Sequence, residues 1–280
     1  MRRGKAFSKS AVYAVLILLS AVFLSPIFII LINALKSNFY ISQQPFTLPD
    51  SETFVGLENF TKGIEQSDFL RALANSAVIT LFSVAGIVLL TSMTAWYIVR
   101  VKNRFTAILY YLFTFSMIVP FQMVMYTMTY VAFELELNSI PGIVIIYLGF
   151  GAGLSVFMFS GFVRSIPTEI EEAAIIDGCS PIQTFFRIVF PILRPTAITV
   201  AILNAMWIWN DYLLPYLLLG SGENRTLPVA VQMALTGGYG NKDMGALMAM
   251  LVLAIVPIIV FYLFSQKYII RGVVAGAVKG

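Results

Sequence analysis

Histidine is absent from this chain of 280 residues, and cysteine occurs only once, as Cys179. A single cysteine excludes a disulfide framework within the chain, and the lack of histidine excludes Cys/His metal sites and histidine-based acid–base catalysis. The phosphate-binding pattern G-x-x-x-x-G-K-[ST] is also missing, so the chain does not hold ATP by that loop.

Charge is scarce as well. Charged residues make up 11% of the sequence, well below the roughly 25% of an ordinary soluble domain. Apolar residues make up 59%, and the mean hydropathy is +0.87. This composition indicates an integral membrane protein. The net charge of +4 is spread along the chain and forms no single basic patch, so nucleic acid is not expected as a partner.

Long apolar runs separate the polar segments. A bilayer core about 30 Å thick needs about 20 apolar residues of helix. Six segments meet this requirement and predict an all-α integral membrane protein with six transmembrane helices: residues 11–35, 72–99, 105–130, 140–163, 196–219 and 244–266. The first run is too long for the apolar core of a signal peptide and has no small-residue cleavage site, so we expect it to remain as a span.

Basic residues mark one side of the predicted spans. The N-terminal segment, the segments after spans two and four, and the C-terminal segment hold 13 of the 18 Lys and Arg residues, with four acids. The other side holds five basic residues and nine acids. Because positively charged loops stay in the cytoplasm, both termini and residues 165–195 are predicted to be cytoplasmic.

The longest segment on the external side is residues 36–71. Its apolar residues recur at helical spacing, for example at Leu57, Phe60 and Ile64, which predicts short amphipathic helices on the outer surface. These helices form either a cap over the spans or a docking surface for an external partner, and the sequence favours neither.

The stretch 165–195 carries four acids inside an otherwise apolar chain. Thr168, with Glu171 three residues later, has the pattern of a capping box and predicts a helix start. Gly178 suits the left-handed conformation that ends a helix. A short first helix is therefore predicted here.

A second short helix is predicted directly after it. Ser180 is an N-cap with Gln183 three residues on, and Pro181 fits the first turn. Pro191 is expected to end this helix, because its ring removes a hydrogen bond and clashes with the previous turn. The apolar face of the helix consists of Ile182, Phe185, Phe186 and Val189.

Two interpretations of this capped stretch compete. In the first, it is a solvated loop whose acids only keep it soluble. In the second, it is a docking site where small residues let another protein approach closely. The small residues are Ala173, Ala174 and Gly178, and the acids around them are Glu169, Glu171, Glu172 and Asp177. The double capping favours docking, since an inert loop needs no such stiffness.

The run EEAAIIDG followed by RIVFP resembles the EAA motif of membrane permeases of ATP-binding-cassette importers. The matching residues are Glu172, Ala173, Ala174, Gly178, Ile188 and Pro191, with Phe190 where the family usually has leucine. The runs GFVRSIPTEIEEAAIIDGCSP, WNDYLLP and QKYIIRGVVAGAVKG are similar to the carbohydrate-uptake branch of that family, which includes the six-span permease subunit of the maltose transporter. The resemblance covers essentially the whole chain.

The resemblance implies a type I ABC importer permease fold in a bacterial cell membrane, with one membrane domain over residues 1–280 and its core at 71–266. Residues 165–195 would be the coupling loop that seats in a cleft of a cytoplasmic ATPase. Residues 267–280 would be a cytoplasmic tail, of which 273–280 also reaches the ATPase. The implied coupling residues are Glu172, Ala173, Ala174, Asp177 and Gly178.

The resemblance also implies a set of partners. These are a second permease subunit, two copies of the ABC ATPase, an extracytoplasmic solute-binding protein and a sugar. The chain itself would be no enzyme and would carry no cofactor, because ATP and Mg²⁺ would bind to the ATPase.

Polar residues inside the spans are candidates for a solute path, because burying them in lipid is costly. The candidates are Gln122 in the third span and Asn204, Trp207, Asn210 and Asp211 in the fifth. Asn204 and Asp211 are seven residues apart and are expected to share a helix face, with a kink at Pro215 just beyond. These residues either line a sugar path or hold helices together.

An ion-coupled secondary transporter is the main alternative. Such proteins typically need several ionisable groups within the membrane and often contain paired repeats. Asp211 is the only acid within any predicted span, and no convincing repeat relates the two halves of the sequence. A channel or a membrane enzyme would need a charged ring or a nucleophile with its base, and neither pattern occurs.

Overall fold

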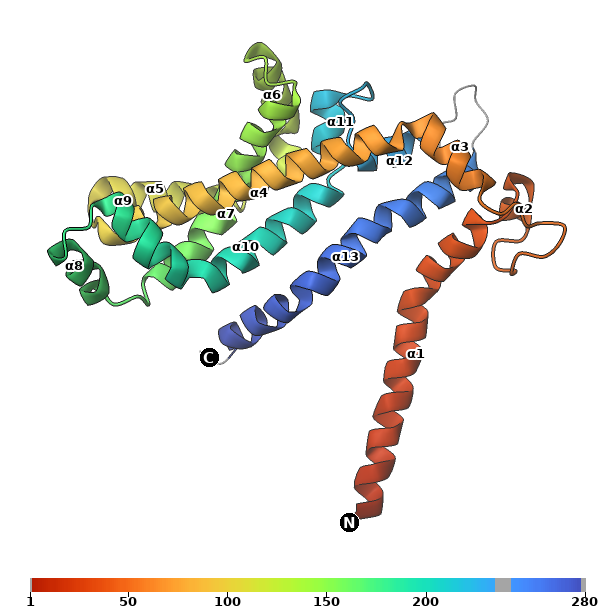
Figure 1. Cartoon of the computed structure of the whole chain (residues 1–280), viewed down its shortest axis with the longest axis horizontal. Coiled ribbons are helices and arrows are strands. Elements are labelled where there is room, and N and C mark those ends of the chain that lie inside the picture. The colour runs from red at the N-terminus through yellow and green to blue at the C-terminus, as the bar shows by residue number, and fades with distance from the viewer. Residues whose placement is uncertain (1, 235–242, 278–280) are drawn as a thin grey trace. The chain divides into compact units, whose positions relative to one another are not determined.

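The computed structural model describes the backbone of residues 2–234 and 243–277, and the side chains of residue 9, residues 12–233 and residues 243–268. Over these ranges the chain forms helices joined by turns, with one isolated β-bridge between Lys36 and Phe54 (Figure 1). It divides into two compact units, residues 1–70 with 230–257 and residues 71–229 with 258–280.

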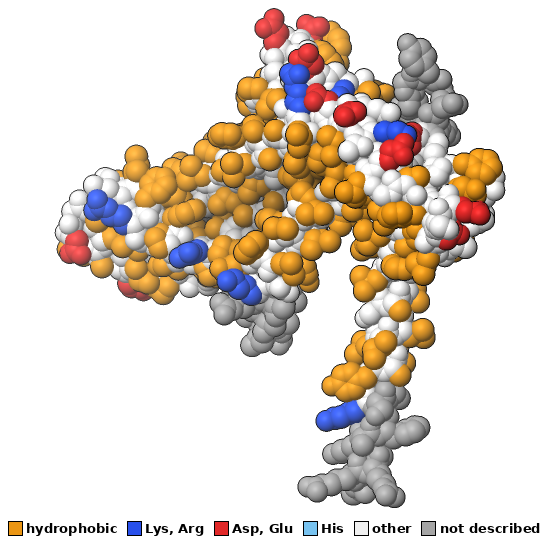
Figure 2. All heavy atoms as spheres, turned by 45° about the vertical axis from the view of Figure 1, so that its right-hand side comes forward, with side chains coloured by type: hydrophobic (Ala, Val, Ile, Leu, Met, Phe, Trp, Pro, Cys, Tyr) orange, Lys and Arg blue, Asp and Glu red, His pale blue; other side chains and the backbone are white. Residues whose placement is uncertain are grey.

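The helices follow one another without a sheet in the described ranges. They are α1 (Arg2–Ala34), α2 (Asn38–Gln43), α3 (Glu58–Ser67), α4 (Phe69–Arg100), α5 (Arg104–Ser116), α6 (Phe121–Glu134), α7 (Ile140–Val163), α8 (Thr168–Ile176), α9 (Pro181–Thr184), the π-helix η1 (Phe185–Val189), α10 (Phe190–Asn210), α11 (Leu213–Leu219), α12 (Leu227–Ala234) and α13 (Met244–Ala277). Hydrophobic side chains cover most of the visible surface (Figure 2). A soluble monomer rarely exposes apolar patches of this extent, so the surface agrees with a chain that lies in a membrane.

Within the residues that the structure describes, five helices are long and apolar enough to cross a membrane, and a bent pair makes a sixth candidate if it counts as one span. The five are Val12–Ala34, Phe69–Arg100, Ile140–Val163, Pro181–Asn210 and Met244–Tyr268. The predicted spans at 11–35, 72–99, 140–163 and 244–266 are therefore confirmed as continuous helices. The other two predicted spans are each interrupted.

The third predicted span, 105–130, is a pair of helices and not one. α5 ends at Ser116, α6 begins at Phe121, and their axes differ by 107°. Pro120 lies between them and explains the break. Its ring clashes with the carbonyl four residues earlier, which belongs to Ser116, so the helix stops there.

The fifth predicted span, 196–219, breaks in the same way. α10 ends at Asn210 and α11 begins at Leu213. Pro215 clashes with the carbonyl of Asp211, four residues before it, so the break lies one turn earlier than the kink expected beyond Asp211. The prediction that Asp211 lies on one helix face with Asn204 is therefore wrong, because the helix has ended before Asp211.

Pro191 does not end the second helix of the 165–195 stretch, so that prediction is also wrong. α9 passes into the π-helix η1 and then into α10, which contains Pro191 in its first turn. In η1 the wider turn pairs the amide of Phe190 with the carbonyl of Phe185, five residues back. The looser ladder accommodates the proline that follows, and the helix continues into the membrane span.

The unit of residues 1–70 and 230–257 contains α2 and α3, which confirms the short helices predicted within 36–71. Asn59 ties α3 to the end of α1, because its side-chain amide donates to the carbonyls of Ala34 at 2.9 Å and Lys36 at 2.7 Å. Lys36 is itself fully buried, and its Nζ donates to the carbonyl of Gln44 at 2.7 Å. Burial lowers the pKa of this lysine.

The unit of residues 71–229 and 258–280 is built around α4, α7 and the η1–α10 helix. Ile87 of α4, Tyr147 and Phe159 of α7, and Leu193 of α10 belong to one cluster of buried side chains. α7 lies close to α4 and α10 at Gly151, where an added Cβ would meet the side chains of Ile87 and Asn204. This core holds α8 and α9 at one end of the unit (Figure 1).

Candidate functional site

The C-terminal end of α8 is stopped by Gly178, as the sequence predicts. Gly178 has φ +85°, in the left-handed region that favours glycine. Its amide donates to Ile175 and the amide of Cys179 donates to Ala174, both at 3.0 Å. These two bonds are the pair of a Schellman motif, and they leave α8 with a sharp, defined end.

The N-terminal end of α8 differs from the prediction. Pro167 occupies the N-cap position, and no side chain caps the helix there. The capping box expected from Thr168 and Glu171 is therefore wrong. Glu171 is only 7% exposed, because its carboxylate turns away from the helix end and toward α4.

Glu171 joins α8 to the end of α4 through an ion pair with Arg100. The guanidinium donates to Oε1 from Nη2 at 2.7 Å and from Nε at 3.0 Å, while Trp96 Nε1 donates to Oε2 at 2.9 Å. Arg100 Nη2 also donates to the carbonyl of Ile166 at 2.9 Å. The side chains of Arg100 and Glu171 are only 18% and 9% exposed. We call Trp96, Arg100 and Glu171 the α8 anchor.

The α8 anchor was not predicted from the sequence, although part of the signal is present there. Trp96 and Arg100 are four residues apart and share a helix face at the end of a span. Their partner lies 71 residues beyond Arg100, so no local pattern points to it.

The opposite face of α8 is exposed. Glu172, Ala173, Asp177 and Gly178 of the predicted coupling residues are exposed, and Ala174 is buried at 6%. Two isoleucines extend the same surface: the exposed fraction is 59% for Ile175 and 84% for Ile176. Bulky apolar side chains exposed together beside small residues and acids, outside the predicted spans, are typical of a protein-docking surface.

The helix after α8 is capped as predicted. Ser180 Oγ accepts from the amide of Gln183 at 3.3 Å, and Gln183 Oε1 accepts from the amide of Ser180 at 2.9 Å. Phe185 is fully buried and its ring lies 5.6 Å from that of Trp96, so η1 packs on the α8 anchor. The predicted apolar face is half right, since Ile182 stays 65% exposed.

A second group of polar side chains lies at the break between α10 and α11. Tyr147 of α7 donates its hydroxyl to Asp211 Oδ2 at 2.9 Å, and the other carboxylate oxygen accepts from the amide of Leu213 at 3.0 Å. Asp211 thus caps α11 and also joins it to α7. The ring of Trp207 packs edge-on against Tyr147 at 5.5 Å and stays 41% exposed. Tyr147 was not predicted, because only the fold brings it to Asp211.

The other three predicted path residues have other partners or surroundings, and Asn210 directly precedes Asp211 in the chain. Asn204 is 5% exposed and donates to Ser155 Oγ of α7 at 3.2 Å, which is the helix-packing role that the sequence left open. Asn210 is exposed and donates to the carbonyl of Met206. Gln122 is exposed in the first turn of α6.

The predicted tail at 267–280 lies mostly outside the described side chains. The helix α13 continues through the tail as far as Ala277, but the side chains that would reach an ATPase, those of 273–280, fall outside the described residues.

Comparison with known proteins identifies close sequence relatives. Residues 87–275 match the family described as "Binding-protein-dependent transport system inner membrane component". The chain is 38% identical to the probable starch degradation products transport system permease protein AmyC of Thermoanaerobacterium thermosulfurigenes, over 94% of each chain. It is 38% identical to the multiple sugar-binding transport system permease protein MsmG of Streptococcus mutans, over 73% of this chain and 75% of that one. It is 30% identical to the melibiose/raffinose/stachyose import permease protein MelC of Bacillus subtilis over the full length of both.

Solved structures share the fold. A chain of a bacterial ABC transporter that imports the acidic polysaccharide alginate matches with a TM-score of 0.79 at 22% identity, over 96% of this chain and 98% of that chain. A chain from the alginate transporter in complex with its pentasaccharide-bound periplasmic protein matches with a TM-score of 0.68 at 14% identity, over 94% and 95%. The type I importer permease fold expected from the sequence is therefore confirmed.

Proposed function

Because the chain belongs to the family of binding-protein-dependent transport system inner membrane components, we propose that it is the permease subunit through which an ABC importer takes up a sugar or oligosaccharide. The three relatives described above are named for starch degradation products, for multiple sugars, and for melibiose, raffinose and stachyose. The observation that carries the coupling part of this function is α8, a helix with a defined C-terminal end, one face anchored to a span and the other exposed.

The exposed face of α8 seats in a cleft of a cytoplasmic ATPase. Ala173 and Gly178 permit close approach, Ile176 supplies apolar contact area, and Glu172 and Asp177 supply charge for pairing. Ala174 is buried and helps to define the end of α8, because its carbonyl accepts the hydrogen bond from the amide of Cys179.

The ATPase drives transport by shifting the populations of two permease states. A partner favours a state only by binding that state better, and reversing a 1:99 ratio takes about 5.5 kcal/mol of differential affinity. A coupling helix that moved freely would absorb this free energy as local motion. The α8 anchor prevents that, because it joins the docking surface to α4.

The assembly contains a second permease subunit, two copies of the ATPase and an extracytoplasmic solute-binding protein. ATP and Mg²⁺ bind to the ATPase, and this chain performs no chemical step. The chain is a multi-pass protein of the bacterial inner membrane, with both termini and α8 in the cytoplasm. The excess of basic residues on that side supports this orientation.

The sugar path passes the break between α10 and α11. The half-exposed ring of Trp207 suits the apolar face of a sugar ring, and Asp211 and Asn210 suit its hydroxyls. Gln122 contributes a further amide. Asn204 supports the path indirectly, because its hydrogen bond to Ser155 holds α10 on α7.

Uptake in membrane vesicles tests this function. Vesicles that contain the complete transporter are given its binding protein and a panel of radiolabelled oligosaccharides. We expect accumulation of at least one of them to stop when internal ATP is depleted and to persist with a proton uncoupler. Uptake that ignores ATP and collapses with the uncoupler would instead establish an ion-coupled secondary transporter.

A further inference from the structure

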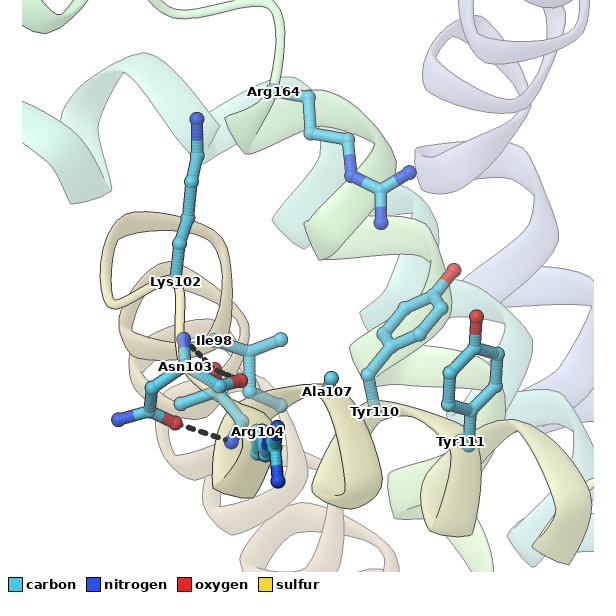
Figure 3. A pocket seen from close by; sticks show the side chains of 9 residues that line it. Ile98, Lys102, Asn103, Arg104, Ala107, Tyr110, Tyr111 and Arg164 are labelled. Carbon is cyan, nitrogen blue, oxygen red and sulfur yellow. Dashed lines mark hydrogen bonds between the residues drawn. The ribbon is translucent and has the colours of Figure 1, made fainter.

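A basic hollow lies where α4 and α7 end and α5 begins. Its volume is about 680 Å³, and its lining includes Lys102, Arg104 and Arg164 together with Tyr110 and Tyr111. Figure 3 shows Lys102 on one side of the opening, with Arg164 and the two tyrosines across from it. A second hollow of about 910 Å³ also has Lys102 and Arg164 in its lining.

The hollow carries positive charge that the described part of the chain leaves uncompensated. No acid lines the first hollow, and no described carboxylate lies within ion-pairing distance of Lys102, Arg104 or Arg164. Glu169 lines only the second hollow. The guanidinium of Arg164 lies 5.2 Å above the ring of Tyr110, a cation–π contact that holds it at the opening.

We propose that this hollow binds the phosphate headgroup of an anionic phospholipid. Lysine and arginine are the residues that bind phosphate oxygens, and basic pockets between spans at the membrane surface are typical sites for anionic headgroups. Tyr110 and Tyr111 fit the same depth, because tyrosine prefers the boundary between headgroups and acyl chains. The proposal does not depend on which sugar the chain transports.

The surface beside the hollow suits an acyl chain. From Arg104 to Tyr111 the lining extends about 10 Å along α5, from the helix start into the apolar region. Ile108, Leu112 and Phe115 share one stripe of α5 beside this lining and beyond it, with exposed fractions of 59%, 60% and 64%. A lipid whose phosphate lies between Lys102 and Arg164 would therefore extend its chains over a continuous apolar surface.

Lipid retention by the purified transporter tests the proposal. The complete complex is extracted from vesicles that contain equal amounts of phosphatidylglycerol and phosphatidylcholine, and its bound lipids are counted by native mass spectrometry. The test variant carries Lys102→Gln, Arg104→Gln and Arg164→Gln. We expect the preference for phosphatidylglycerol to fall by at least about tenfold, since each basic residue near the surface adds to the attraction.

Two control variants separate the site from general charge effects. The first removes three exposed cations outside the hollow, with Lys9→Gln, Arg187→Gln and Arg194→Gln, and should keep the preference for phosphatidylglycerol. The second, with Arg104→Lys and Arg164→Lys, keeps the charge and should keep most of the preference. If the neutral variant fails to assemble, the lysine variant still tests the proposal. Equal retention of phosphatidylglycerol and phosphatidylcholine by the lysine variant would then refute it.

Three further outcomes would overturn the proposal. If the hollow bound inorganic phosphate while the wild type retained no more phosphatidylglycerol than phosphatidylcholine, the hollow would be a site for free phosphate. If the neutral variant lost the ATPase during purification while its lipid retention stayed unchanged, the hollow would contact a protein partner. Equal phosphatidylglycerol retention by the wild type and the neutral variant would also contradict it.

Discussion

The ion pair between Arg100 and Glu171 gives the sharpest test of how α8 transmits force. Glu171→Gln keeps the size of the side chain and leaves an oxygen that can accept from Trp96, but it removes the negative charge. Arg100 then remains as a nearly buried cation with only the carbonyl of Ile166 as a partner. The docked arrangement of α8 loses stability, whereas the spans keep all their packing.

The free-energy cost of Glu171→Gln follows from the burial of the ion pair. Removing one partner of a buried pair costs about 3–5 kcal/mol, because the other charge stays behind unpaired. Arg100 is 18% exposed, so some water reaches it, and we expect the lower end of this range, about 3 kcal/mol. That free energy corresponds to a roughly 100-fold increase in the population with α8 undocked.

Amide hydrogen exchange of the complete transporter in lipid nanodiscs measures that population. Exchange in residues 168–177 should accelerate by about 100-fold in Glu171→Gln, and sugar transported per ATP hydrolysed should fall. Glu169→Gln is the matched control, since it removes the same charge from an exposed position of the same helix and should leave exchange unchanged.

The double variant Arg100→Gln with Glu171→Gln completes the cycle. Replacing both charges leaves no unpaired ion, so its exchange should be slower than the sum of the two single effects predicts. If Glu171→Gln changed neither exchange nor coupling, the anchor would contribute nothing to holding α8. The proposal that the anchor transmits the movement of α8 to α4 would then be wrong.

Three further substitutions test the docking surface and the path. Glu172→Lys should uncouple ATP hydrolysis from uptake while the chain still inserts in the membrane, and normal uptake would count against docking by this face. Gly178→Val should impair uptake more, since a β-branched residue resists the φ of +85° there; co-purification of the ATPase measures the loss of docking, and full retention would contradict it. Tyr147→Phe removes the hydroxyl bonded to Asp211, so the sugar concentration for half-maximal uptake should rise several-fold with ATPase binding unchanged, and an unaltered concentration dependence would remove this group from the path.

The sequence predicts the continuous spans well, because their signal is local. An apolar run of sufficient length has few alternatives to a membrane helix, and four of the six predicted spans are continuous. The two breaks are each associated with a proline, since α5 ends at Ser116 before Pro120 and α10 ends at Asn210 before Pro215. A proline rule alone would not have identified them, because Pro26 and Pro257 lie inside the continuous helices α1 and α13.

The side-chain partners could not be predicted, because they depend on long-range packing. Glu171 fits a capping box locally, yet the fold offers it Arg100 and Trp96, and a buried ion pair with an indole donor outweighs a cap of about 1 kcal/mol. Asp211 likewise depends on Tyr147, which is 64 residues away. Local patterns identified these acids as important and could not identify what they bind.

The helix that begins at Pro181 connects the docking surface to the proposed sugar path. From Pro181 to Asn210 it is continuous over 30 residues, which at 1.5 Å per residue is about 45 Å. Its first turns pack on the α8 anchor through Phe185, and its last residue precedes the break at Asp211. In the proposed mechanism, a displacement of α8 by the ATPase would reach the path along this one helix. The π-helix η1 is the place where this helix can yield, because its hydrogen-bond ladder is already loosened there. A helix that can yield at one segment would allow two arrangements of the path, which is what the proposed population shift requires.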